Sequence, residues 1–318
     1  MWISPYKYVL SLGHLCSDIN QSILSAVLPF LIATYHYDYT TAAMLVTVST
    51  VFGAFVQPFI GMLSDKKNKL LYMTLGVLLA SGGMAVTGFI SNFFGLWIVV
   101  IMSGIGVAMF HPQAAKLFNS VSSKNAKGKG MSIFSFGGKV GFTLGPVYTA
   151  FLMNLFGMKG TILFLIPGIV FGIVCSFFNK DFENLDVLEV EKKEKVKSEQ
   201  KDDWSGFIKL CCVVFSRSIL SNGISTFLAF YFIQQFSKSN SFASMLLSVF
   251  YGIGSITLLG GGIADCFGHR KMVRLSFCIF LPAIFIFTNT SHFVIALIML
   301  IFMTCGESLS YSPMVVLG

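Results

Sequence analysis

Uncharged apolar runs, each about as long as a membrane crossing, alternate with short polar segments along almost the whole chain. A helix needs about 20 mostly apolar residues to cross the hydrocarbon layer of a bilayer. The pattern therefore predicts an all-α polytopic membrane protein with about ten transmembrane helices. These helices are expected over residues 9–32, 41–63, 70–90, 93–115, 131–153, 160–179, 207–235, 242–263, 271–289 and 292–315. One stretch, Leu70 to Ala115, runs for 46 residues without a formal charge, which suits two crossings with a turn at Ser91-Asn92.

Composition excludes most soluble classes of protein. Hydrophobic residues make up 55% of the chain and charged residues 11%, whereas a soluble domain carries roughly 25% charged residues. The formal net charge of +8 could suggest a nucleic-acid partner. The basic residues are spread over short gaps between apolar runs and form no basic face, so we expect no nucleic-acid partner.

A charged segment divides the predicted helices into six and four. Residues 180–204 hold six lysines and nine acidic residues, a composition typical of a solvated linker. We predict an N-terminal six-helix half over 1–179, a charged cytoplasmic linker over 180–204 and an incomplete C-terminal half over 205–318. A tether without chemistry is the preferred interpretation of the linker, and a regulatory docking site is the alternative.

The distribution of lysine and arginine predicts the orientation. Cytoplasmic loops of membrane proteins carry an excess of these residues. With a cytoplasmic N-terminus, 18 of the 22 basic residues fall on the inner side, and the opposite orientation would reverse this bias. We therefore predict a multi-pass protein of the inner (cytoplasmic) membrane.

A loop pattern occurs twice, 200 residues apart, after the second and the eighth predicted helix. Glycine in such a loop lets helices approach closely, aspartate pairs near a helix end, and the basic residues can hold an inner gate closed. The pattern resembles the G-x-x-x-D-(R/K)-x-G-(R/K)-(R/K) motif of the major facilitator superfamily. Its residues are Gly61, Asp65, Lys66 and Lys69 in the first copy and Gly261, Asp265, Gly268 and Arg270 in the second. Asn68 replaces a glycine and Cys266 a basic residue, which puts the second gate contact in doubt.

Further motifs resemble those of particular groups within this superfamily. Gly137, Gly141, Gly145 and Pro146 in the fifth helix are similar to the G-x-x-x-G-P pattern of antiporters in that superfamily, although a helix-packing face explains them equally. Three other stretches, Gly13-His14 to Gln21, Phe110-His111-Pro112-Gln113 and Arg217-Ser218 with Thr226-Phe227-Leu228, resemble the fosmidomycin-resistance group of drug exporters. The resemblance implies two six-helix halves, alternating access and a monomer. It also implies that two helices beyond the tenth are missing.

Ionisable groups inside a bilayer are costly, so each one is a functional candidate. The candidates are His14, Asp18, His111, Lys139, Arg217 and Glu307. The 200-residue repeat pairs the first helix with the seventh and the fourth with the tenth, and the resemblance implies that these four line the central cavity. Asp18 and His14 are four residues apart on one helical face. We hypothesise that Asp18 takes up the coupling proton while Arg217 competes for it. A static buried ion pair is the alternative.

The remaining candidates concern the cargo and a second proton site. Glu307 is either that second site or a lock on helix packing, and His111 is either a cargo contact or a structural hydrogen bond beside Pro112. Cationic side chains would suit an anionic cargo through charge-assisted hydrogen bonds. The predicted cavity residues are Arg217, His111, Lys139, Gln21 and Gln113, and Gln113 could equally bridge two helices.

The resemblance implies a secondary active transporter, and we expect it to export small anionic drugs or metabolites such as fosmidomycin in exchange for protons. The alternatives are a proton-symport uptake carrier and an inactive truncated product. The sequence has no phosphate-binding G-x-x-x-x-G-K-(S/T) motif and no H-E-x-x-H pair, so we expect no enzyme activity, no cofactor and no metal. The expected partners are a small-molecule substrate, protons and the lipid bilayer.

Overall fold

The computed structural model describes residues 5–64, 69–121, 127–178, 204–255 and 267–309. Within these ranges the chain forms helices and no strand. It divides into two compact units, Met1–Lys197 and Ser198–Gly318. The predicted linker, 180–204, lies almost wholly outside the described residues, and its role stays a prediction.

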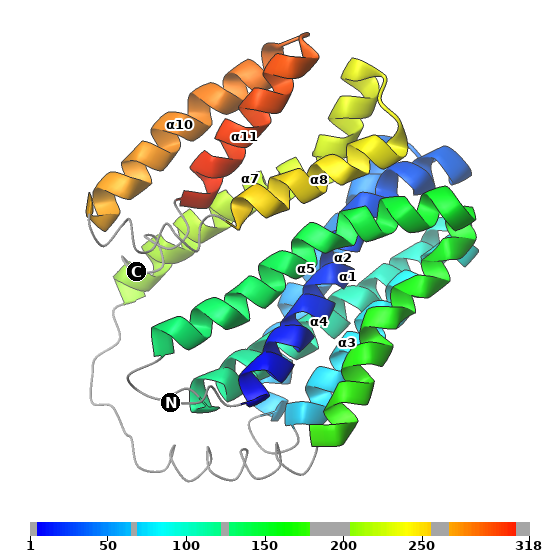
Figure 1. Ribbon diagram of the computed structural model, residues 1–318, viewed down its shortest axis with the longest axis vertical. Coiled ribbons are helices and arrows are strands. Elements are labelled where there is room, and N and C mark those ends of the chain that lie inside the picture. The colour runs from blue at the N-terminus through cyan, green and yellow to red at the C-terminus, as the bar shows by residue number, and fades with distance from the viewer. Residues whose placement is uncertain (1–4, 65–68, 122–126, 179–203, 256–266, 310–318) are drawn as a thin grey trace. The chain divides into compact units, whose positions relative to one another are not determined.

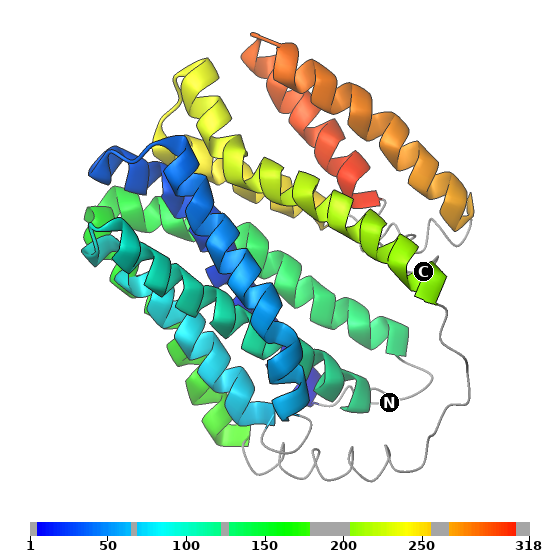
Figure 2. The same cartoon turned by 180° about the vertical axis from the view of Figure 1, so that it is seen from behind.

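The first unit is built around the N-terminal helix. Helix α1 packs most extensively against α5 and also contacts α4, while α3 and α2 pack on α4. Figures 1 and 2 show α1 in blue and α5 in green side by side. The elements are α1 (Pro5–Tyr35), α2 (Tyr39–Ser64), α3 (Lys69–Val86), η1 (Thr87–Phe89), α4 (Phe93–Val121), α5 (Lys127–Phe156), η3 (Gly157–Leu165) and a helix over 166–178.

The second unit contains α7 (Trp204–Phe236), α8 (Asn240–Gly254), α10 (His269–Asn289) and α11 (Phe293–Leu309). Helices α10 and α11, orange and red in Figure 1, form a closely packed pair, and α8 contacts both α7 and α11. Ser239 begins α8 because its side chain accepts a hydrogen bond from the Phe242 amide at 3.3 Å, the usual role of serine before a helix.

Seven of the described helical segments are long and apolar enough to cross a membrane, and Phe293–Leu309 is a shorter apolar helix. The predicted count of ten therefore stays a prediction. The predicted turn at Ser91-Asn92 is confirmed, because Asn92 precedes α4 and its Oδ1 accepts a hydrogen bond from the Gly95 amide at 2.6 Å.

The predicted helix over 160–179 is wrong in its first part. Helix α5 ends where Gly157 adopts a φ of 57°, a conformation that glycine reaches without steric cost. A 3-10 segment then runs to Leu165, and the Tyr148 hydroxyl donates to the Leu163 carbonyl at 2.6 Å. The α-helix resumes only at residue 166. The predicted helix over 242–263 is described as far as Gly254, and its remainder falls outside the described ranges apart from Ser255.

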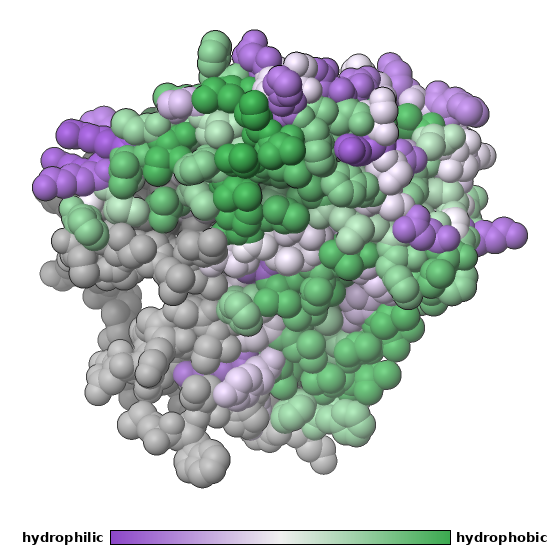
Figure 3. Space-filling view, turned by 45° about the horizontal axis from the view of Figure 1, so that its top comes forward, coloured by the Kyte–Doolittle hydropathy of each residue, from purple (hydrophilic) through white to green (hydrophobic). Residues whose placement is uncertain are grey.

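Large apolar side chains cover much of the outside. Phe94 and Phe177 are each 79% exposed, which a water-soluble helical protein would avoid. On the face shown in Figure 3, apolar (green) side chains form broad areas and hydrophilic (purple) ones gather towards the rim. This surface suits a hydrocarbon environment.

Three glycines of α5 let it lie directly against the backbone of α1. A Cβ on Gly137, Gly141 or Gly145 would overlap atoms of Ser11, Leu15 and Ser22 respectively. Small residues four apart on one helix allow this close approach. The resulting contact fixes the position of the polar residues of α1 relative to α5.

Candidate functional site

Three ionisable side chains of the first unit meet between α1, α4 and α5. The Nε2 atom of His14 lies 3.3 Å from Oδ2 of Asp18, and Nε2 of His111 lies 3.3 Å from Oδ1 of the same carboxylate. Asp18 is only 3% exposed. We name His14, Asp18 and His111 the proton cluster. The one-turn spacing of His14 and Asp18 predicted their contact, which is confirmed, but no sequence pattern predicted that His111 reaches the same carboxylate.

His14 is held by a residue of α5. Its Nδ1 lies 2.8 Å from the main-chain carbonyl oxygen of Phe134, and because a carbonyl only accepts, Nδ1 must be the donor. The rings of His14 and Phe134 are stacked with centroids 4.2 Å apart, and the His111 ring meets His14 edge-on at 5.2 Å. A buried apolar layer that includes Leu10, Phe118 and Phe171 surrounds this region.

Gly138 leaves room for the pair formed by His14 and Asp18. A Cβ at this position would lie 2.5 Å from Oδ2 of Asp18 and 2.6 Å from Nε2 of His14. One ring nitrogen each of His14 and His111 and one carboxylate oxygen of Asp18 all lie within 4.8 Å of one another. They can therefore share one bound proton or another small cation.

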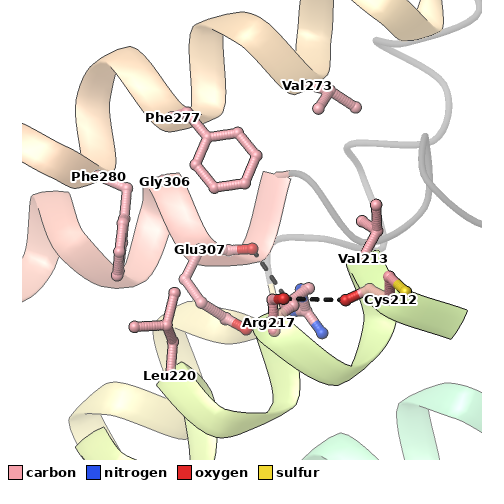
Figure 4. A pocket seen from close by; sticks show the side chains of 10 residues that line it. Cys212, Val213, Arg217, Leu220, Val273, Phe277, Phe280, Gly306 and Glu307 are labelled. Atoms are coloured by element: carbon pink, nitrogen blue, oxygen red, sulfur yellow. Dashed lines mark hydrogen bonds and ion pairs between the residues drawn. The ribbon is translucent and has the colours of Figure 1, made fainter. Parts of the chain in front are cut away.

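The second unit carries a charged pair at the wall of a pocket. Nη2 of Arg217 on α7 donates a short hydrogen bond to Oε1 of Glu307 on α11, and both side chains are largely buried. The adjoining cavity has a volume of about 420 Å³. Figure 4 shows Phe277, Leu220 and the charged pair around it. Its described lining consists of Cys212, Val213, Ser216, Arg217, Leu220, Val273, Phe277, Phe280, Gly306 and Glu307. We name it the Arg217 pocket.

The other predicted cavity residues are not members of the proton cluster. Lys139 is half-buried on α5, and its charge acts on His14. Gln21 is exposed on α1. Gln113 is buried and donates to the Ile60 carbonyl on α2 at 3.4 Å, a contact between two helices. Arg217 belongs to the second unit and pairs there with Glu307, and its action on Asp18 stays a prediction.

Half of the eight loop-motif residues fall outside the described residues, namely Asp65, Lys66, Gly261 and Asp265. The described members are placed as follows. The Gly61 carbonyl accepts a hydrogen bond from Nζ of Lys116 at 3.3 Å. Lys69 begins α3, and Arg270 is exposed near the start of α10. Gly268 precedes α10 with a φ of 90°, which explains a glycine at this position of the motif.

Two residues next to the proton cluster, Phe134 and Gly138, were not predicted from the sequence as part of the site. Phe134 acts through its main-chain carbonyl and its ring, and an apolar residue in a helix gives no signal for such a role. Gly138 could have been found, because it adjoins Gly137 in a doublet that interrupts the spacing of four. A glycine outside the packing stripe needs a separate reason, and the reason is the space that His14 and Asp18 occupy.

Relatives of known sequence match most of this chain. The chain is 23% identical over 276 residues to the fosmidomycin resistance protein of Escherichia coli strain K12. That match covers 83% of this chain and 66% of the relative, so the chain spans about two-thirds of the relative's length.

Solved structures agree in fold. A bacterial homolog of the human lysosomal transporter Spinster, in an inward-facing and occupied conformation, superposes with a TM-score of 0.78 at 16% identity, over 98% of this chain and 73% of that one. A D-xylose-proton symporter gives a TM-score of 0.75 at 15% identity, over 98% of this chain and 81% of that one. At these identities the likeness establishes the fold alone.

The family follows from a match over nearly the full chain. The sequence model of the Major Facilitator Superfamily matches residues 10–318. This match and the relative from E. coli confirm the predicted resemblance to the fosmidomycin-resistance group. A membrane-spanning, all-helical fold of the same kind accompanies it. The chain therefore belongs to the Major Facilitator Superfamily.

Proposed function

We propose that this protein exports small anionic drugs or metabolites, fosmidomycin among them, from the cytoplasm in exchange for protons. The observation that carries the proposal is the proton cluster, in which two histidines face the carboxylate of Asp18, a residue that is only 3% exposed. Ionisable groups within a membrane are expensive to keep and mark ion pathways and proton relays. A static ion pair would need only one of the two histidines.

The proton cluster contains side chains that can change their charge. Histidine is the side chain whose ordinary titration falls nearest to neutral pH. With one added proton, the carboxylate of Asp18 and one imidazolium balance each other. Without this proton the cluster holds a buried net negative charge, which a low-dielectric surrounding disfavours. Binding and release of a proton therefore change the energy of the arrangement, which is what coupling to a conformational change requires.

The Arg217 pocket supports an anionic cargo. A guanidinium recognises carboxylates and phosphonates through paired, charge-assisted hydrogen bonds. The pocket holds this cation among apolar walls that include Phe277 and Phe280, and its volume of about 420 Å³ lies within the range usual for small-molecule sites. Glu307 neutralises Arg217 when no cargo is bound, so an anionic cargo has to displace that carboxylate.

The name of one relative supports the proposed cargo, and the name of a structural neighbour suggests an alternative direction. The relative from E. coli is named for fosmidomycin resistance, and one structural neighbour is named as a proton symporter. The second name keeps proton-symport uptake as the alternative, with the same residues and the opposite direction of cargo. Alternating access of the two halves around a central site would serve either direction.

The test uses the purified 318-residue chain in liposomes with an imposed pH gradient. Labelled fosmidomycin should accumulate on the acidic side, as exchange against protons requires. The Asp18→Asn variant should lose the effect of the gradient. Asp38→Asn is the matched control, because Asp38 lies in the loop between α1 and α2 and asparagine can still accept the Thr41 amide. Accumulation on the alkaline side would favour symport, and equal distribution with the parent chain would contradict the proposal.

A further inference from the structure

The hydrogen bond between His14 and Phe134 fixes the tautomer of the His14 ring. The main-chain carbonyl of Phe134 can only accept, so Nδ1 of His14 carries a hydrogen. This leaves Nε2 as the nitrogen that faces Oδ2 of Asp18 at 3.3 Å. A neutral ring would then direct its Nε2 lone pair at the carboxylate. Two acceptors would face each other in a buried place with no hydrogen between them, an arrangement that is strongly unfavourable.

The pair formed by His14 and Asp18 must therefore hold one more proton than the neutral ring and the carboxylate would carry. Two contacts favour its location on the imidazole. Nε2 of His111 lies 3.3 Å from the other oxygen of Asp18, and a polarised imidazole this close favours the ionised carboxylate. The Phe134 ring, stacked at 4.2 Å, favours a cation on His14.

Burial of the ring disfavours the charged form of His14, and one neighbouring group also opposes the charge. Lys139 on α5 acts on His14 as a like charge. Among the described residues, the titratable or charged groups that act on the pair from the neighbouring helices are His111 and Lys139. The proton is thus held by Asp18 and the Phe134 ring against the repulsion of Lys139, so that it can be bound and also released.

We infer that the coupling proton rests on Nε2 of His14, with Asp18 as its counterion, and that its release requires His14 to separate from either Asp18 or the Phe134 carbonyl. This deepens the proposed function and rests on it, because it identifies the atom that carries the proton. It also links release of the proton to a change in the contacts of His14. Phe134 belongs to α5 and His14 to α1, so release by separation from the Phe134 carbonyl breaks a contact in the most extensive helix interface of the first unit, whereas release by separation from Asp18 rearranges α1 alone.

The experiment is nitrogen-15 NMR of the histidine-labelled full chain in lipid nanodiscs. The chain has five histidines, and the His14 signals are assigned by their loss in the His14→Gln variant. At neutral pH we expect protons on both ring nitrogens of His14 in the parent chain. In Asp18→Asn, the proton on Nε2 should be lost, because an amide can donate to the bare nitrogen.

The outcomes separate this inference from the proposed function. A neutral His14 ring in the parent chain, in either tautomer, would overturn the inference whatever the transport assay shows. The same spectrum in the parent chain and in Asp18→Asn would also overturn it, since Asp18 would not be the counterion. A doubly protonated His14 that becomes neutral in Asp18→Asn supports the location of the proton. If transport in such a chain ignored the pH gradient, the proposed function alone would fail.

Discussion

His14 and Phe134 are joined twice, by a hydrogen bond of 2.8 Å from Nδ1 of the imidazole to the main-chain carbonyl and by stacking of the two rings at 4.2 Å. This double contact ties α1 to α5 at the point where Asp18 is buried. It turns a histidine and an aspartate one turn apart, a common pattern on helix surfaces, into a pair with a defined proton.

Two substitutions at His14 separate its ability to donate a hydrogen bond to Asp18 from its ability to bind and release a proton. In His14→Gln the side-chain amide reaches the position of Nε2 and can donate to Asp18 without titrating, whereas in His14→Asn it reaches only the position of Nδ1. We expect both variants to lose proton-driven transport by about tenfold or more, a barrier change of at least about 1.4 kcal/mol. Gradient-driven fosmidomycin flux measures this. Full activity of His14→Gln would show that His14 only positions Asp18.

Enlarging Gly138 should separate His14 from Asp18. The Cβ in Gly138→Ala would lie 2.5 Å from Oδ2 of Asp18, and the ends of these two side chains can move while the helix backbones stay in place. We therefore expect a folded protein that has lost proton-driven flux. Gly82→Ala in α3 is the matched control, because nothing lies within 4 Å of a Cβ there. Thermal unfolding should be similar for both variants. Normal flux in Gly138→Ala would contradict the assigned geometry.

Glu307 should act as an internal competitor for the cargo of the Arg217 pocket. Glu307→Gln removes the carboxylate that neutralises Arg217, so anionic cargo should bind more tightly. Hydrogen bonds to charged groups contribute about 1.5–3 kcal/mol, so the gain should be about tenfold or more. Calorimetric titration with fosmidomycin in detergent measures the affinity.

Arg217→Gln should abolish the same binding. Arg274→Gln, which alters an exposed arginine of α10, is the control for the lost positive charge. If Glu307→Gln weakened binding while Arg217→Gln left it unchanged, the pocket would not be the anion site.

Asp38 should make the start of α2 sensitive to acid. Its Oδ1 accepts the Thr41 amide at 2.7 Å, and the hydrogen bonds to Thr41 lower the pKa of this exposed carboxyl. A lowered pKa stabilises the folded form above the unfolded pKa, and this stabilisation disappears as the pH falls through the folded pKa. Hydrogen exchange of the Thr41 amide, corrected for its intrinsic rate, should therefore accelerate in acid. In Asp38→Asn the corrected rate should not change with pH.

Much of the fold could be predicted because each crossing leaves a long apolar run. The run from Leu70 to Ala115 gave both its helices and the turn at Asn92. The error over 160–179 has a local cause. Hydrophobicity reports that a segment is buried or faces lipid, but it does not distinguish an α-helix from the 3-10 turns that follow Gly157.

The candidate site was predictable only in its chemistry. The cost of charge in a membrane singled out His14, Asp18 and His111, and helical spacing predicted the first contact. The approach of His111 to Asp18 depends on how α4 packs against α1, which no local pattern encodes. The role of Phe134 rests on a main-chain atom, and every residue has one. The contact of Arg217 with Glu307 likewise depends on how α7 and α11 meet in the second unit, which no local pattern encodes.

The most direct test of proton exchange measures the internal pH of liposomes that contain the purified chain and a trapped pH-sensitive dye. Fosmidomycin is added outside without any initial pH gradient, with liposomes of the Asp18→Asn variant as the control. Exchange predicts that protons leave as cargo enters, so the lumen of the parent liposomes should become alkaline while that of the variant stays unchanged. Acidification of the lumen would contradict exchange and establish symport. Cargo entry without a pH change would contradict proton coupling itself.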